Sequence, residues 1–285
     1  MKQCKALIRK EWQTHKGSIL IPLWFTGAIY VMGLLGLIIN YIREGRITIV
    51  TGGMKVSAME ASAGLYGVTH ALMAMLGMVS IITAVILADG MINGAFKRKC
   101  EILHLSQPVT MLKVLGSKYA LLILGSVILM MGLSLINSLV LVGLANFWMP
   151  VNTYYAMVAW LQGSIGITLS LLVVASYYWL SAAVFKRKSF FMGTLVILGI
   201  EVAIAILNYT ARLGIPSLME YIGSLVTIQV YPGPQTGNPF GPLLLDSIIT
   251  RQWQSFVSWQ TLLKLVYSAV FFLGGYWFYN RRELS

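Results

Sequence analysis

Long apolar runs alternate with short polar segments along the whole chain. Six of these runs hold almost no charge, and each is long enough to cross a hydrocarbon core of about 30 Å as a helix rising 1.5 Å per residue. A helix satisfies its own backbone hydrogen bonds, which lipid cannot do, and the alternating pattern of a membrane barrel is absent. We predict spans over 18–40, 63–88, 118–144, 155–184, 189–209 and 262–279.

The composition agrees with this pattern. Of the 285 residues, 58% are hydrophobic and 11% are charged, whereas about 25% of the residues of a soluble domain carry a charge. A chain this apolar cannot cover its surface in water. We therefore expect an all-α integral membrane protein that forms a single transmembrane domain over residues 1–285.

The basic residues predict the orientation of the spans. Of the 21 Lys and Arg residues, 15, Lys113 and Lys118 among them, fall near the termini and in the connections after the second and fourth spans. Basic residues near span ends stay in the cytoplasm, so both termini are expected there, in a bacterial inner membrane or another plasma membrane. These cations, placed to meet anionic lipid head groups, account for the net charge of +12 without a nucleic-acid partner.

The segment before the first span, residues 1–16, has a helical pattern. Leu7, Ile8 and Trp12 recur on one face, whereas Arg9 and other cations occupy the remaining faces. This spacing is typical of a helix in the cytoplasmic interface with its apolar side toward lipid. A short disordered basic tail is the alternative.

The connection between the fifth and sixth spans, residues 212–260, is too apolar for a solvated loop. Two stretches, "IPSLMEYIGSLV" and "GPLLLDSIITRQWQSFVSW", have amphipathic helical patterns, and Pro242 suits a first helical position because its missing N–H is not needed there. We predict two short helices, re-entrant or interfacial, in the outer leaflet before the last span.

Motifs for catalysis and metal binding are absent from the sequence. There is no G-x-x-x-x-G-K-[ST] phosphate loop, no H-E-x-x-H and no Cys/His ligand spacing, so we predict no catalytic residue, metal site or cofactor on this chain. Glu201 is the one ionisable residue deep within a span. Because a carboxylate in lipid is costly, Glu201 either lines a transport pathway or forms a structural hydrogen bond with a neighbouring helix.

The connection after the second span has an unusual composition. Residues 95–122 read "AFKRKCEILHLSQPVTMLKVLGSKYALL", and we predict a short cytoplasmic helix over 95–108 that pairs a wet face with an apolar one and ends at a helix-breaking proline. Its candidate contact residues are Lys97, Arg98, Lys99, Glu101, Ile102, Leu103, Leu105 and Pro108. Such a helix suits docking in a groove on a soluble partner, or it is a connector that rests on lipid.

The stretch "CEILHLSQPVTMLKVLGSKYALL" resembles a segment of type-two ATP-binding-cassette exporter permeases that reads roughly T-L-E-x-L-L-S-x-P-V-S-x-x-x-x-L-x-G-K. The matching residues are Glu101, Leu103, Leu105, Ser106, Pro108, Val109, Leu115, Gly116 and Lys118. Two features depart from the family: "NGAFKRKC" is basic where the family often has an acidic stretch, and Thr110 stands where serine is common.

The resemblance implies a half-transporter without catalytic activity of its own. A second permease protomer, identical or homologous, would complete the pore, and two separate soluble ATPase subunits would bind ATP and Mg and hold the 95–108 coupling helices. The substrate would be lipidic, amphipathic or peptide. The alternatives are a secondary transporter or channel not driven by ATP, and a permease that serves metalloenzyme maturation. A membrane-bound enzyme would need a catalytic constellation, and none is visible.

Overall fold

The computed structural model describes residues 2–44, 58–97, 110–148, 150–186, 188–226 and 242–283. Within these ranges the chain is almost entirely helical and contains no strand. The helices are α1 (Lys2–Ile19), α2 (Ile21–Glu44), α3 (Ala58–Lys97), α5 (Met111–Trp148), α6 (Thr153–Val184), α7 (Ser189–Ala211), α8 (Leu218–Val226), α9 (Pro242–Phe256) and α10 (Trp259–Glu283).

Six stretches of the described chain are helical, long and apolar enough to cross a membrane: 8–36, 61–94, 111–147, 153–184, 189–211 and 259–281. Each contains most of one predicted span. The prediction of an all-α chain with six helices long and apolar enough to span a membrane is therefore confirmed for the described residues.

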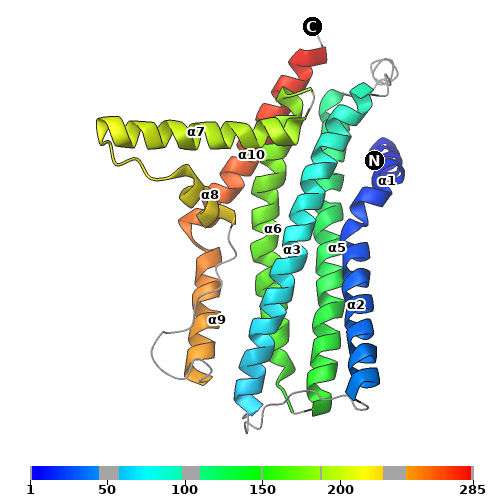
Figure 1. The fold of residues 1–285 in the computed structure, drawn as a ribbon. Helices are drawn as coiled ribbons and strands as arrows, with labels where there is room; N and C mark the ends of the chain where they lie inside the picture. The colour runs from blue at the N-terminus through cyan, green and yellow to red at the C-terminus, as the bar shows by residue number, and fades with distance from the viewer. Residues whose placement is uncertain are drawn as a thin grey trace.

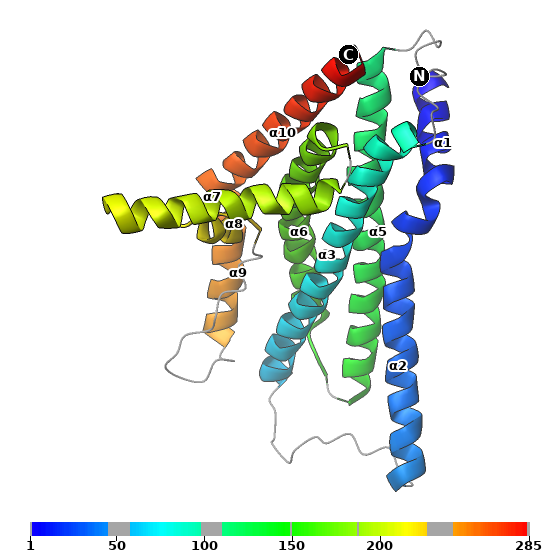
Figure 2. The ribbon, with the colours of Figure 1, turned by 45° about the horizontal axis from the view of Figure 1, so that its top comes forward.

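Helices α2, α3, α5 and α6 run side by side as an elongated bundle (Figures 1 and 2). The most extensive contact is that of α3 with α6, and glycines allow the two backbones to approach closely. A Cβ atom on Gly163 would lie 3.2 Å from the side chain of Met73, and one on Gly77 would lie 2.8 Å from Ile167. Small residues at a helix interface permit this packing where no hydrophobic effect drives association.

Both chain termini lie at the same end of the bundle, which we call the terminal end (Figure 1). The last turn of α3, the start of α5 and the α6–α7 turn lie there too, whereas the starts of α3 and α6 lie at the opposite end. The segments that the sequence analysis assigns to the cytoplasm therefore share one end of the molecule.

Helix α7 matches the fifth predicted span in length and apolarity but not in direction. It leaves the terminal end and projects sideways from the bundle, roughly perpendicular to the long helices, in both views (Figures 1 and 2). Lys188, which precedes α7, and Arg212, which follows it, have left-handed backbones with φ of 53° and 51°. The left-handed backbone of Lys188 thus directs α7 outward, and only Ser189 and Gly193 of this helix are buried.

The connection between α7 and α10 contains two short helices, α8 and α9, and α9 begins at Pro242. Their position at the outer leaflet stays a prediction. Both helices pack against α6. Helix α10 starts only three residues after α9 ends, so the two form a helical segment that is interrupted at Val257 and Ser258.

Helix α3 extends beyond the predicted end of the second span. The predicted span ends at residue 88, and α3 continues through Asp89 and Gly90 to Lys97, so residues 95–97, expected to begin a separate cytoplasmic helix, belong to α3. Asn93 donates a hydrogen bond to Asp89 Oδ1 (2.7 Å), and Gly90 lies beside the His15 ring. Because protein groups satisfy these polar residues, the helix does not have to end where they begin.

Candidate functional site

A cluster of buried polar side chains joins four segments at the terminal end of the bundle. Its central residue is Lys118 of α5, which is only 3% exposed. The Lys118 ammonium group donates a hydrogen bond to the backbone oxygen of Met91 in α3 (2.9 Å). It also lies 3.9 Å from Glu11 of α1. We call this cluster, Lys118 with Glu11, His15, Asp89, Asn93 and Ser189, the terminal clasp.

The position of Lys118 differs from the surface position expected of it. The sequence analysis counts it among cations that meet lipid head groups, whereas α1 and α3 cover it in the structure. A buried ammonium group is stable only with partners that replace its hydration, and the Met91 oxygen and the Glu11 carboxylate provide them. Lys118 also ends the motif that carries the family resemblance, and Leu115 of the same motif is buried in the main core.

Glu11 brings α1 into the clasp. Its carboxylate lies 3.6 Å from Nε2 of His15, one turn further along α1, and the residue is 8% exposed. Sequence reasoning missed Glu11 because the helical pattern of this segment was judged from its apolar stripe and its cations alone. One signal was available in the sequence. Glu11 is the only acidic residue among residues 1–16, and a lone carboxylate among cations is a candidate for an ion pair with a buried cation.

The α6–α7 turn is held by the other half of the clasp. Ser189, the first residue of α7, donates a hydrogen bond to Asp89 Oδ1 (2.6 Å), the oxygen that also accepts from Asn93. Asn93 lies 3.4 Å from the backbone oxygen of Phe185. The clasp therefore links α1, α3 and α5 with the start of α7.

The predicted contact residues of the 95–108 segment lie next to the clasp in sequence. Lys97 is the last residue of α3. Arg98, Lys99, Glu101, Ile102, Leu103, Leu105 and Pro108 fall outside the described residues. Helix α3 ends and α5 begins at the terminal end (Figure 1), so the segment connects two helices that Lys118 already holds together.

The N-terminal segment is helical, as predicted, and packs on α5 and α3. Ile8, Arg9 and Trp12 are exposed, whereas Glu11 and Ile19 face the bundle. Leu7 lies in α1, but its side chain is outside the described part. The apolar residues Ile8 and Trp12 thus remain uncovered by this chain, and their contact with interfacial lipid stays a prediction.

Glu201 braces two helices. Its carboxylate accepts hydrogen bonds from the Ser217 hydroxyl (2.7 Å) and from the backbone N–H of Met219 (3.1 Å). These donors lie at the start of α8, where a helix has unpaired N–H groups that a carboxylate satisfies well. Of the two roles considered for Glu201, the described contacts correspond to the structural one.

A second buried polar group, unnoticed in the sequence, fastens α9 to the bundle. The Tyr66 hydroxyl of α3 lies 2.8 Å from Gln162 Oε1 of α6 and 3.2 Å from Gln252 Oε1 of α9. Gln162 donates to the backbone oxygen of Ile249 (3.0 Å), and Gln252 Nε2 lies 3.1 Å from His70 Nε2. Sequence reasoning missed the glutamines because it weighed only ionisable residues within the spans.

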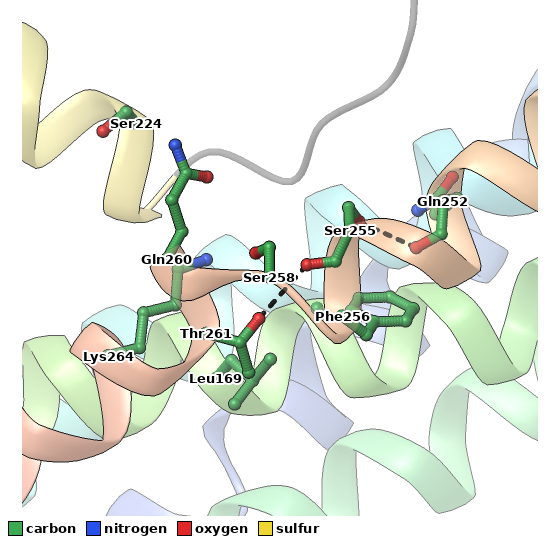
Figure 3. Close-up of a pocket in the computed structure, with 10 residues that line it drawn as sticks. Leu169, Ser224, Gln252, Ser255, Phe256, Ser258, Gln260, Thr261 and Lys264 are labelled. Carbon is green, nitrogen blue, oxygen red and sulfur yellow. Dashed lines mark hydrogen bonds between the residues drawn. The ribbon is translucent and has the colours of Figure 1, made fainter.

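A polar pocket lies at the interruption between α9 and α10 (Figure 3). The Ser255 hydroxyl donates a hydrogen bond to the backbone oxygen of Gln252 (2.7 Å). Across the break, the Thr261 hydroxyl donates a hydrogen bond to the backbone oxygen of Ser255 (3.2 Å). Ser258 and the half-buried Lys264 also line the pocket. Lys264 falls at the start of the last predicted span, among the six basic residues expected on the outer side, and the structure brings it to this polar pocket.

Comparison of the chain with protein-family models, with curated proteins and with solved structures finds no match in any of the three.

Proposed function

We propose that this chain is the membrane-spanning permease subunit of an ATP-driven exporter of the ATP-binding-cassette class. It would pair with a second permease protomer, identical or homologous, and with separate soluble ATPase subunits that bind ATP and Mg. The chain itself would catalyse no covalent chemistry. It would change the arrangement of its helices when the ATPase moves the 95–108 segment, and so release a lipidic, amphipathic or peptide substrate on the outer side.

The observation that carries the proposal is the burial of Lys118. This residue completes the motif on which the family resemblance rests, and it ties α5 to the backbone of α3 and to Glu11 of α1. A segment that only rested on lipid would not require its flanking helices to be joined by a buried charge. A segment that transmits the movement of an ATPase would need flanking helices that are firmly joined, because loosely joined helices would absorb the movement.

The lengths of α3 and α5 support the same proposal. With 40 and 38 residues, they are about 60 and 57 Å long at 1.5 Å per residue, about twice the thickness of a hydrocarbon core. Two such helices extend well beyond the membrane and would carry the 98–109 segment to a soluble partner. Their continuity would let a push at this segment reach the opposite side.

The proposal is tested by purifying the full chain from its native membrane in a gentle detergent and identifying the subunits that accompany it. We expect a soluble ATPase and a second permease protomer. In the reconstituted complex, Leu103→Asp and Leu105→Asp should break the dependence of ATP turnover on the membrane subunit, because a carboxylate buried without a partner is costly. Leu103→Met is the matched control and should retain that dependence.

Two results would contradict the proposal. One is the absence of an ATPase from every preparation that contains the intact chain. The other is an intact complex in which ATP-driven transport is unchanged by both aspartate variants.

A secondary transporter is the second candidate, and the interruption between α9 and α10 favours it. Discontinuous helices with polar groups at the break are typical of coupling-ion and substrate sites in such transporters, and Ser255, Ser258 and Thr261 lie at this break. Transport by the purified chain alone, driven by an ion gradient without any ATPase, would select this candidate over the first.

A further inference from the structure

A large apolar cavity lies beneath α7, away from the terminal clasp. Its volume is about 530 Å³, within the range of about 300–1,000 Å³ that sites for small organic ligands occupy. The wall is apolar or aromatic, and α6, α7, α8 and α10 each contribute to it, for example through Val174, Ile197, Ile222 and Phe271.

The polar pocket at the α9–α10 interruption lies about one helical turn from the apolar cavity along three helices. Three helices line both spaces with residues about one turn apart, which lie on the same helix face: Val173 and Leu169 on α6, Tyr221 and Ser224 on α8, and Tyr267 and Lys264 on α10. The hydroxyls of Tyr221 and Tyr267 are 3.0 Å apart and lie on the apolar side of this boundary. The combined space thus changes along its length from apolar to polar.

The polar part carries one positive charge. Lys264 is half-buried, and no carboxylate is among the residues that line either space. Within the described ranges, no Asp or Glu oxygen lies within 4.0 Å of its ammonium group. Gln260 and Ser258 lie close to Lys264 in the polar pocket (Figure 3) and add hydrogen-bond donors. This set is complementary to an anionic head group.

We propose that the two spaces together bind one acidic phospholipid of the surrounding membrane. Its head group would contact Lys264, Gln260 and Ser258, and one acyl chain would occupy the cavity beneath α7. The cavity is partly open rather than enclosed, so the second chain can remain in the bilayer. This site is independent of the proposed ATP-driven function, and binding requires neither an ATPase nor transport.

The test is native mass spectrometry of the purified full chain, titrated in detergent with phosphatidylglycerol or with phosphatidylcholine. We expect one phosphatidylglycerol molecule to be retained tightly per chain and phosphatidylcholine to bind more weakly. Lys264→Gln should weaken phosphatidylglycerol binding about tenfold, the loss expected for one charge-assisted contact, and leave phosphatidylcholine unchanged. Lys113→Gln, which alters an exposed lysine, is the control for charge.

A second pair of variants tests the cavity. Ile222→Trp should fill the space beneath α7 and reduce retention of both lipids, whereas Leu124→Trp, on an exposed position of α5, should not. Thermal unfolding of each variant establishes that the fold is intact. Equal binding of the two lipids by the original chain would overturn the proposal. Two further results would also overturn it. One is equal phosphatidylglycerol affinity for the Lys264→Gln and Lys113→Gln variants, and the other is unchanged retention of both lipids by the Ile222→Trp variant.

Discussion

The ammonium group of Lys118 has partners on two other helices, the Met91 oxygen of α3 and the Glu11 carboxylate of α1. Both charges are almost completely removed from solvent. In such surroundings, an ion loses its hydration and depends on the groups that replace it. The pair therefore adds little net stability, but it fixes the relative positions of α1, α3 and α5, because separating these helices would leave a buried charge without its partner.

We predict that Lys118→Met destabilises the chain strongly, because it leaves the Glu11 carboxylate buried without its cation. Removing one partner of a buried pair costs about 3–5 kcal/mol. The measurement is thermal unfolding in detergent, with Lys113→Met at an exposed position of the same helix as the control. The double variant Lys118→Met/Glu11→Gln should recover part of the loss. Equal unfolding temperatures for Lys118→Met and Lys113→Met would contradict a structural role for the clasp.

At the scale of elements, α7 is distinguished by how little of it this chain covers. It is held by Ser189 at its start, and just past its middle Glu201 joins it to α8. The hydrogen bonds of Tyr177 with the Gly193 oxygen (2.7 Å) and of Tyr178 with Thr194 (2.9 Å) attach its first turns to α6. These few polar contacts, rather than a broad apolar interface, set the direction of the helix.

We predict that Glu201→Leu loosens the start of α8, because it removes the acceptor for Ser217 and for the Met219 N–H. Hydrogen exchange of the α8 amides should accelerate in this variant. Glu201→Gln keeps one acceptor oxygen and should retain most of the protection. Glu220→Leu, at an exposed carboxylate in the first turn of α8, is the control. If Glu201→Gln preserved α8 protection but abolished transport by the complete exporter, the charge of Glu201 would be needed in the pathway.

At the scale of the whole molecule, the arrangement of the chain ends bears on the predicted orientation. The terminal end carries both termini and the α6–α7 turn, and the α5–α6 turn lies at the opposite end (Figure 1). The excess of basic residues predicts that the terminal end faces the cytoplasm. Because these segments share one end of the bundle, they must all lie on the same side of the membrane.

We predict that, in intact cells, a membrane-impermeant thiol reagent labels Pro150→Cys in the α5–α6 turn and does not label Lys186→Cys in the α6–α7 turn. Both variants are made in a background with Cys4 and Cys100 replaced by serine. After the cells are opened, both positions should react. Labelling of position 186 from outside, without labelling of position 150, would contradict the prediction and show that the terminal end faces outward.

The sequence by itself determined the helices of this protein. A helix in lipid needs an apolar stretch of sufficient length and no partner for its backbone, so composition within each stretch is enough to predict it. This is why six apolar helices agree with the predictions. The continuation of α3 to Lys97 depends on the pairing of Asp89 and Asn93 inside the protein, which the order of residues does not reveal.

Only the tertiary structure decided which residues meet. Lys118 and Glu11 are 107 positions apart and Tyr66 and Gln252 are 186 positions apart, and no periodicity links them. The crosswise direction of α7 follows from left-handed backbone at Lys188 and from a handful of hydrogen bonds, neither of which an apolar pattern encodes. The terminal clasp, the glutamine contacts of α9 and the cavity beneath α7 all depend on such distances, because a buried polar group or a cavity is defined by its neighbours in space.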